Sequence, residues 1–147
     1  MVARRTLTLI ENEIGNAIVG AAMKIHSAVG PGLLESAYET CLLYELERQG
    51  HPVRRQMSIP IRYEDLTIDN GYRVDLLVRD LVVVELKAIE VVLPVHRAQP
   101  LSYLKLGQFK LGYLLNFHVA HMRDGIFRMV NGLGVTASPA QPPRPPR

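Results

Sequence analysis

The chain has 147 residues, 48% of them hydrophobic, which is enough to build one domain around a single buried core. No stretch approaches the roughly 20 consecutive apolar residues of a membrane span, the polar N-terminus is unlike a signal peptide, and the single cysteine, Cys41, excludes an intramolecular disulfide and a thiolate zinc cluster, so we expect a soluble, cytoplasmic protein. Four arginines outside the patterned region account for the net charge of +3, because without them 13 basic residues face 14 acidic ones, and bulk charge alone therefore does not identify a nucleic-acid-binding protein.

Two amphipathic helices are predicted in the first third of the chain. Apolar side chains recur every three or four positions over residues 14–29, and Gly30 and Pro31 end the pattern. The apolar positions are Ile14, Ile18, Ala21, Ala22, Ile25 and Val29. A second helix is predicted from Leu33 or Leu34 to Gln49, with Gly50 just beyond its end. Its expected core positions are Tyr38, Cys41, Leu42 and Leu46.

A hairpin is predicted to follow these helices. Residues 57–63 alternate apolar and polar side chains, which is the period of a half-buried strand, and Pro60 indicates an edge position or a bulge. The tripeptide at residues 69–71, Asp-Asn-Gly, predicts the hairpin turn. Residues 72–78 alternate again as the returning strand, and Arg79-Asp80 predicts the next turn.

The third predicted strand carries the strongest chemical signal. Residues 81–88 are apolar except for Glu85 and Lys87, which predicts a central strand buried on both faces. Side chains alternate along a strand, so Glu85 and Lys87 must share one face, where burying them without partners would be costly. Asp75, on the preceding strand, can lie across from Glu85.

This arrangement predicts a site for a divalent cation. Two carboxylates so close together repel each other unless a positive charge lies between them, and a hard, oxygen-seeking ion such as Mg²⁺ (or Mn²⁺) meets that need. Asp75 and Glu85 would be ligands, and the backbone carbonyl of Leu86 can be the third. Phosphodiester hydrolysis requires a metal-held phosphate, an acidified water and stabilised oxygen charge. Lys87 would orient or activate the water and neutralise phosphate charge.

The remaining elements are a helix over residues 94–106, a buried strand over residues 109–117 and a short last strand over residues 125–130. Pro100 lies inside the predicted helix, where it costs about 3 kcal/mol unless the helix bends, so we expect a kink there. Residues 1–133 are thus predicted to form the domain, and residues 134–147, rich in proline and arginine, a disordered extended tail.

Three further residues are candidates for the site. Gln99 and Tyr103 are four residues apart, so they share a helix face that can look onto the metal. Glu35 begins the second helix, where a carboxylate is favourable and can reach a metal-bound water. His26 and His96 are left outside the site, because a lone histidine is more often a structural residue than a ligand.

Taken in order, four segments resemble the motifs of the GxxExxxR proteins of the PD-(D/E)XK nuclease superfamily, with the motif order of its RecB-like and lambda-exonuclease-like branch. The segments are Gly32-Leu33-Leu34-Glu35, Gly71-Tyr72-Arg73-Val74-Asp75, Glu85-Leu86-Lys87 and Gln99-Pro100-Leu101-Ser102-Tyr103. The resemblance runs over residues 14–130. It implies an α/β, restriction-endonuclease-like fold with an αβββαβ core, a mixed central sheet flanked by helices and an extra N-terminal helix.

The same resemblance implies a Mg²⁺-dependent nuclease that acts on nucleic acid, with DNA as the expected substrate. Metal binding is expected at Glu35, Asp75, Glu85 and the Leu86 carbonyl, and the catalytic group also includes Lys87, Gln99 and Tyr103. The chain departs from the pattern twice. Glu39 stands where the motif has arginine, which reverses a charge near the entrance, and Pro100 interrupts the Gln-Tyr helix. Neither departure removes a metal ligand.

Ordinary structural explanations compete with this hypothesis. Asp75 could be a solvent-facing hairpin charge, and Glu85 and Lys87 an ion pair, although the motif order favours the joint site. A zinc hydrolase is disfavoured, because none of the five histidines is paired at helical ligand spacing. The stronger rival is an inactive nuclease-fold module for nucleic-acid binding or assembly, which would gain little from acidic groups facing a phosphate. A homodimer is left open. The candidate phosphate contacts are Arg73, Arg97, Lys105 and Lys110.

Overall fold

A computed structural model describes residues 7–132, so the predicted tail lies outside the described residues. In chain order the elements are α1 (Leu9–Val29), α2 (Glu35–Arg48), β1 (Val53–Tyr63), β2 (Leu66–Val78), β3 (Val82–Lys87), α3 (Pro94–Gly107), β4 (Leu111–Asn116), the 3₁₀ helix η1 (Met122–Gly125) and β5 (Ile126–Val130). This order confirms the predicted αβββαβ core, with its additional N-terminal helix and short last strand. Among residues 7–132, no helix is both long enough and apolar enough to cross a membrane.

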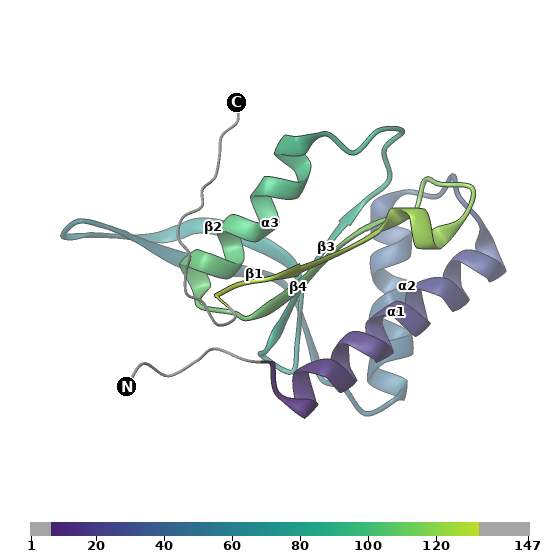
Figure 1. Ribbon diagram of the computed structural model, residues 1–147, viewed down its shortest axis with the longest axis horizontal. Helices are drawn as coiled ribbons and strands as arrows, with labels where there is room; N and C mark the ends of the chain where they lie inside the picture. The colour runs from purple at the N-terminus through teal and green to yellow at the C-terminus, as the bar shows by residue number, and fades with distance from the viewer. Residues whose placement is uncertain (1–6, 133–147) are drawn as a thin grey trace.

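The five strands form one mixed sheet in the order β1-β2-β3-β4-β5. Only β3 and β4 are parallel, and α3 makes the crossover that a parallel pair requires. Figure 1 shows α3 on one side of the sheet and α1 and α2 on the other. Alternate residues of β3 confirm the two layers, because Val82 and Val84 pack with α1 and α2, whereas Val83 packs with α3. The central strand is therefore buried on both faces, as predicted.

Helix α1 begins earlier than the apolar pattern predicts. Thr8 caps it: the Glu11 main-chain N–H donates to Thr8 Oγ1 over 3.1 Å, and the Thr8 N–H donates to the Glu11 carboxylate over 2.8 Å. This reciprocal cap starts the helix at Leu9, five residues before the first buried apolar position, Ile14. The helix ends at Val29, as predicted, although that side chain is 45% exposed in the last turn.

The hairpin turn lies at Glu64 and Asp65, because Tyr63 pairs with Leu66, and the turn predicted at residues 69–71 is wrong. These three residues instead lie in β2 opposite Pro60 of β1, where the register shifts. They form the bulge that Pro60 predicted, at a position where proline has no N–H to offer the partner strand. A side chain at Gly71 would clash with Ile61, so the bulge requires glycine there.

Asn116, at the end of β4, fixes the chain just after β3. Its Oδ1 accepts hydrogen bonds from the main-chain N–H groups of Ile89 (3.1 Å) and His118 (3.3 Å), and its Nδ2 donates to the Ile89 carbonyl over 2.9 Å. The Phe117 N–H also donates to the Lys87 carbonyl over 3.0 Å. These bonds hold the exits of two parallel strands together and therefore set where Lys87 lies.

Replacing Asn116 with alanine should destabilise the protein by about 2 to 4 kcal/mol, because half-buried main-chain groups of Ile89 lose both of their partners. Urea unfolding followed by circular dichroism measures this. Asn16→Ala, at an exposed position in the middle of α1, is the matched control and should stay within about 0.5 kcal/mol of the parent. Equal unfolding midpoints for the two variants would show that the Asn116 network is dispensable.

Candidate active site

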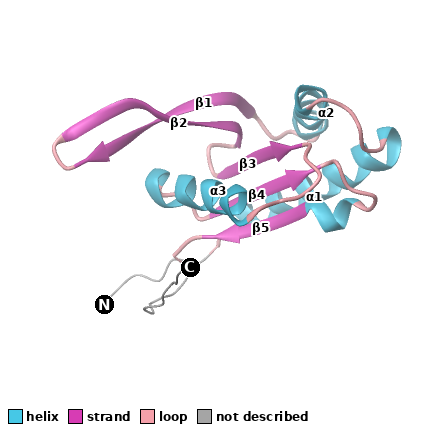
Figure 2. Ribbon diagram, turned by 90° about the horizontal axis from the view of Figure 1, so that it is seen from above, coloured by secondary structure: helices cyan, strands magenta, loops and turns pink. Residues whose placement is uncertain are grey.

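The site forms where β2 separates from β3. The two strands pair only through Leu76, Leu77 and Val78 of β2. The part of β2 that precedes Leu76 pairs with β1 alone, and together they form an arm that extends past the other three strands (Figure 2). The side-chain alternation of β2 breaks at this point, because Val74 packs in the α3 layer whereas Leu76 packs in the α1 and α2 layer. Asp75 is the residue at the break.

Carboxylates replace the strand ladder at this break. The Leu86 main-chain N–H donates to Asp75 Oδ2 over 2.8 Å, and the Asp75 N–H donates to Glu85 Oε2 over 3.2 Å. Each acidic side chain thus accepts a main-chain bond from the opposite strand. The structure brings Asp75 and Glu85 together at the edge of the central strand.

The surroundings of Glu85 disfavour its charge. Its side chain is 6% exposed, and burial, followed by the neighbouring Asp75 charge, raises the pKa of Glu85 to about 8. Lys87 on the same strand face opposes this rise only weakly. Among residues 7–132, no ion pair within 4.0 Å involves Asp75, Glu85 or Lys87. The ordinary ion-pair explanation of Glu85 and Lys87 therefore does not describe this structure.

Helix α3 brings Gln99 and Tyr103 to the same place. The carboxylates of Glu85 and Asp75 act on the Tyr103 hydroxyl, whose pKa is raised first by burial and then by these two charges. Gln99, one helical turn before Tyr103, opposes this rise in the Tyr103 pKa. The Tyr103 ring also stacks on Tyr72 of β2, with centroids 4.2 Å apart, and the Tyr72 hydroxyl donates to the Tyr103 carbonyl over 3.0 Å. The β2 arm and α3 are therefore joined beside the site by Tyr72, a contact that was not predicted from the sequence.

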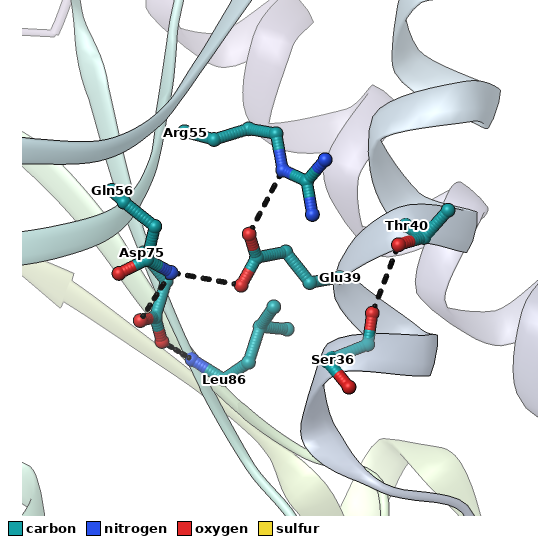
Figure 3. Close-up of polar contacts among 7 residues, drawn as sticks. All are labelled: Ser36, Glu39, Thr40, Arg55, Gln56, Asp75 and Leu86. Atoms are coloured by element: carbon teal, nitrogen blue, oxygen red, sulfur yellow. Dashed lines mark hydrogen bonds and ion pairs between the residues drawn. The ribbon is translucent and has the colours of Figure 1, made fainter.

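Glu35 is not joined to this group. It is exposed at the start of α2, and among the described residues no hydrogen bond or ion pair links it to Asp75 or Glu85. Glu39, one helical turn later, is connected instead (Figure 3). Gln56 Nε2 donates to Glu39 Oε1 over 3.0 Å and to Asp75 Oδ1 over 3.4 Å.

The sequence predicted that Glu39 places a reversed charge near the entrance, but the side chain is buried, with 7% exposure. It is paired with Arg55, whose Nε donates to Glu39 Oε2 over 3.0 Å. Arg55 and Gln56, which precede the alternating segment, were not among the predicted site residues. Gln56 has a φ of 51°, a left-handed conformation that costs a residue with a side chain about 1 to 2 kcal/mol. No sequence signal marks that position.

The four basic residues predicted to contact phosphate are scattered. Arg73 on β2 and Lys105 on α3 are exposed. The Arg97 guanidinium lies 4.9 Å from the centre of the Phe127 ring, on the β5 side of α3. Lys110 directly precedes the first residue of β4, at the opposite end of the parallel pair from Lys87.

The donor groups at the break fit a hard cation better than zinc. Main-chain groups of one residue in a strand point to the same edge, so the Leu86 carbonyl lies on the edge where its N–H meets Asp75. Within the described part of the chain, no cluster of three or more His, Cys, Asp or Glu side chains could hold a metal. Two carboxylates and a carbonyl oxygen suit Mg²⁺, which keeps several waters and is completed by substrate phosphate. His26 and His96 are occupied with main-chain atoms of Val119 and Leu93.

A family model described as the PD-(D/E)XK nuclease superfamily matches residues 12–129, from α1 to β5. The chain belongs to the PD-(D/E)XK nuclease superfamily. No curated protein and no solved structure is significantly similar to it. Members of the superfamily are nucleases that generally use divalent metal ions, and the mixed sheet with helices on both faces is its restriction-endonuclease-like fold. The superfamily thus supports a phosphodiesterase that acts on nucleic acid.

The raised pKa of Glu85 predicts how stability depends on pH. The folded state holds the Glu85 proton up to a pH of about 8, whereas an ordinary glutamate releases it near pH 4.5, so the Glu85 contribution to the free energy of unfolding should fall as pH rises between these values. Urea unfolding in EDTA at several pH values measures the fall, and Glu85→Gln should remove it. Mg²⁺ should restore stability most at the upper end of this pH range, because a cation binds the ionised carboxylate. Parallel pH profiles for the parent and Glu85→Gln would contradict this prediction, and Glu13→Gln, at an exposed position of α1, is the control.

Proposed function

We propose that this chain is a Mg²⁺- or Mn²⁺-dependent nuclease of the GxxExxxR type that hydrolyses phosphodiester bonds, with DNA as its substrate. The observation that carries the proposal is the pair of carboxylates at the end of the β2–β3 ladder. The Glu85 carboxylate accepts from the Asp75 main-chain N–H there and the Asp75 carboxylate from the Leu86 N–H, and no ion pair with a basic side chain of the described residues neutralises them. Two adjacent acidic groups without such a partner favour a bound cation.

In this proposal Asp75, Glu85 and the Leu86 carbonyl hold the metal. A bound divalent ion would coordinate and orient the scissile phosphate and would make a bound water more acidic. Glu35 lies one helical turn before Glu39 on the same face of α2, so we assign it an outer role, reaching the site through water. The two main-chain bonds keep the carboxylates in place before any ligand arrives, which lowers the ordering needed on binding.

Lys87 is the proposed group that orients or activates the attacking water. It is half-buried, shares a β3 face with Glu85 and is held by the β3–β4 pairing opposite Asn116. Its ammonium would orient the attacking water and neutralise charge that develops on the phosphate oxygens.

Helix α3 would complete the catalytic group. The Tyr103 hydroxyl is protonated at neutral pH, and its raised pKa strengthens that preference, so we assign it a hydrogen bond to a phosphate oxygen, with Gln99 orienting it from the same helix face. Arg73 and Lys105 are exposed on the β2 arm and on α3, the two elements that carry Asp75 and Tyr103, and we assign them phosphate contacts near the site. Arg97 and Lys110 would contact only a longer nucleic acid.

Asp75→Asn and Glu85→Gln should each reduce cleavage at least about 100-fold while the protein stays folded, because each loses a charged metal ligand. Asparagine is preferable to alanine at position 75, because it keeps an acceptor for the Leu86 N–H. The assay uses labelled single-stranded, duplex and flapped DNA with Mg²⁺ and Mn²⁺, alongside calorimetric Mn²⁺ titration. Asp80→Asn, in the exposed β2–β3 turn, should cleave like the parent. Parent-like cleavage by either site variant contradicts the assignment, and a parent that binds nucleic acid without cleaving it indicates the inactive module.

Lys87→Ala should bind Mn²⁺ as the parent does but lose a factor on the order of 10² to 10³ in single-turnover rate, because only transition-state stabilisation is removed. Lys87→Arg should also be slow, since a planar guanidinium cannot replace a compact ammonium at a crowded site. Lys24→Ala, a surface lysine of α1 that pairs with Glu45, is the control. An undiminished rate would exclude Lys87 from catalysis, and lost Mn²⁺ binding would make it a structural counter-charge.

A further inference from the structure

Gln56 of β1 links Glu39 of α2 to Asp75 of β2. Its side-chain nitrogen donates to Glu39 of α2 over 3.0 Å and to Asp75 Oδ1 over 3.4 Å (Figure 3). The amide orientation follows from these contacts, because the opposite orientation would place the amide oxygen against two carboxylates. Since Asp75 Oδ2 accepts from the Leu86 N–H, both oxygens of Asp75 have fixed donors.

The backbone of β1 is distorted at this residue. Consecutive side chains of a strand normally point to opposite faces, yet Arg55 and Gln56 both contact the Glu39 carboxylate. The left-handed φ of 51° at Gln56 accounts for this. Cα pairing between β1 and β2 skips Gln56 and Asp75, so the irregular position of each strand faces that of the other. Strained backbone of this kind persists where surrounding contacts impose it, often at a functional site.

The chemistry of the linking group suits a carboxylate that must bind a cation. A basic side chain in contact with Asp75 would pair with it and compete for its oxygens. Gln56 instead offers two N–H donors and no charge, so it separates Glu39 from Asp75 without neutralising either. The positive charge of Arg55 is directed to Glu39 Oε2, on the far side of that carboxylate.

We propose that Gln56 is a positioning residue for Asp75, and that Glu39 and Arg55 hold the Gln56 amide in place. Glu39 acts on the site only through Gln56. The inference rests on the proposed nuclease function, because it assigns the orientation of a metal ligand. It also explains the charge reversal at position 39, since a buried carboxylate there is the acceptor that anchors the amide.

Gln56→Gly in the full-length protein is the direct test. Glycine adopts a φ of 51° without strain, so the variant should fold, and only the amide is lost. We expect Mn²⁺ affinity and kcat each to fall on the order of 10-fold, the lower end for groups that orient metal ligands, because Gln56 is exposed. The KM for DNA should change less than about 2-fold, since no substrate contact is removed. The matched control is Gln108→Gly, which replaces a glutamine with a φ of 61° at the end of α3 and should change none of these quantities.

A double-mutant cycle tests the role of Glu39. Glu39→Gln should lower kcat in the parent but cause no further loss in the Gln56→Gly background, because its effect passes through the amide. Independent losses that add would refute that route. The Leu86 amide signal in NMR, with its hydrogen-exchange rate, reports the Asp75 bond in EDTA without substrate.

We expect Gln56→Gly to shift the Leu86 signal and speed its exchange, whereas Gln108→Gly leaves both unchanged. An unchanged Leu86 amide in Gln56→Gly, or parent-like Mn²⁺ affinity, overturns the positioning role even if the parent cleaves DNA. A parent that neither binds Mn²⁺ nor cleaves refutes the proposed function, while the Leu86 signal still decides whether Gln56 positions Asp75.

Discussion

The hydrogen bond from the Leu86 amide to Asp75 Oδ2 is the interaction on which the site depends. Where β2 leaves β3, a main-chain N–H in the central strand loses its ladder partner, and an unpaired buried group costs about 1 to 3 kcal/mol. The Asp75 side chain replaces that partner, which fixes one carboxylate beside Glu85. The same separation frees the β2 arm to reach α3, where Tyr72 stacks on Tyr103. The position of the acidic pair and the path of the β2 arm beside it thus both follow from the Asp75 side chain accepting a hydrogen bond that a main-chain carbonyl would accept in a regular ladder.

This geometry opposes stability locally. Glu85 is buried beside a second carboxylate, and Gln56 occupies a left-handed conformation. Such features persist only when the rest of the fold imposes them. Here the two hydrophobic layers do so: the central strand packs against α1 and α2 through Val84 and Leu86, and against α3 through Val83. Glu85 shares the α3 face of β3 with Val83, so its buried carboxylate lies beside a packed part of the sheet and not in a loop.

Sequence patterns predicted the parts of the site that follow regular periodicity. Glu85 and Lys87 are conspicuous because the strand around them is otherwise apolar, and strand alternation alone places them on one face. Gln99 and Tyr103 share a helix face by their four-residue spacing, and the structure brings that face to the carboxylates. The capping box that starts α1 was also present in the sequence, as Thr8 and Glu11, but an interpretation based on apolar positions did not use it.

The rest could not be predicted because it depends on departures from periodicity. The tripeptide at residues 69–71 has the composition of a turn, but its position opposite Pro60 makes it a bulge, and only the register of two strands distinguishes these outcomes. Gln56 is polar next to an alternating segment, which by itself indicates a solvated side chain. Its link to Asp75 arises because a positive φ turns it toward Glu39, a residue 17 positions away in the sequence. A local pattern specifies which face a side chain occupies only while the backbone is regular, so residues that act at backbone irregularities are the ones that sequence periodicity conceals.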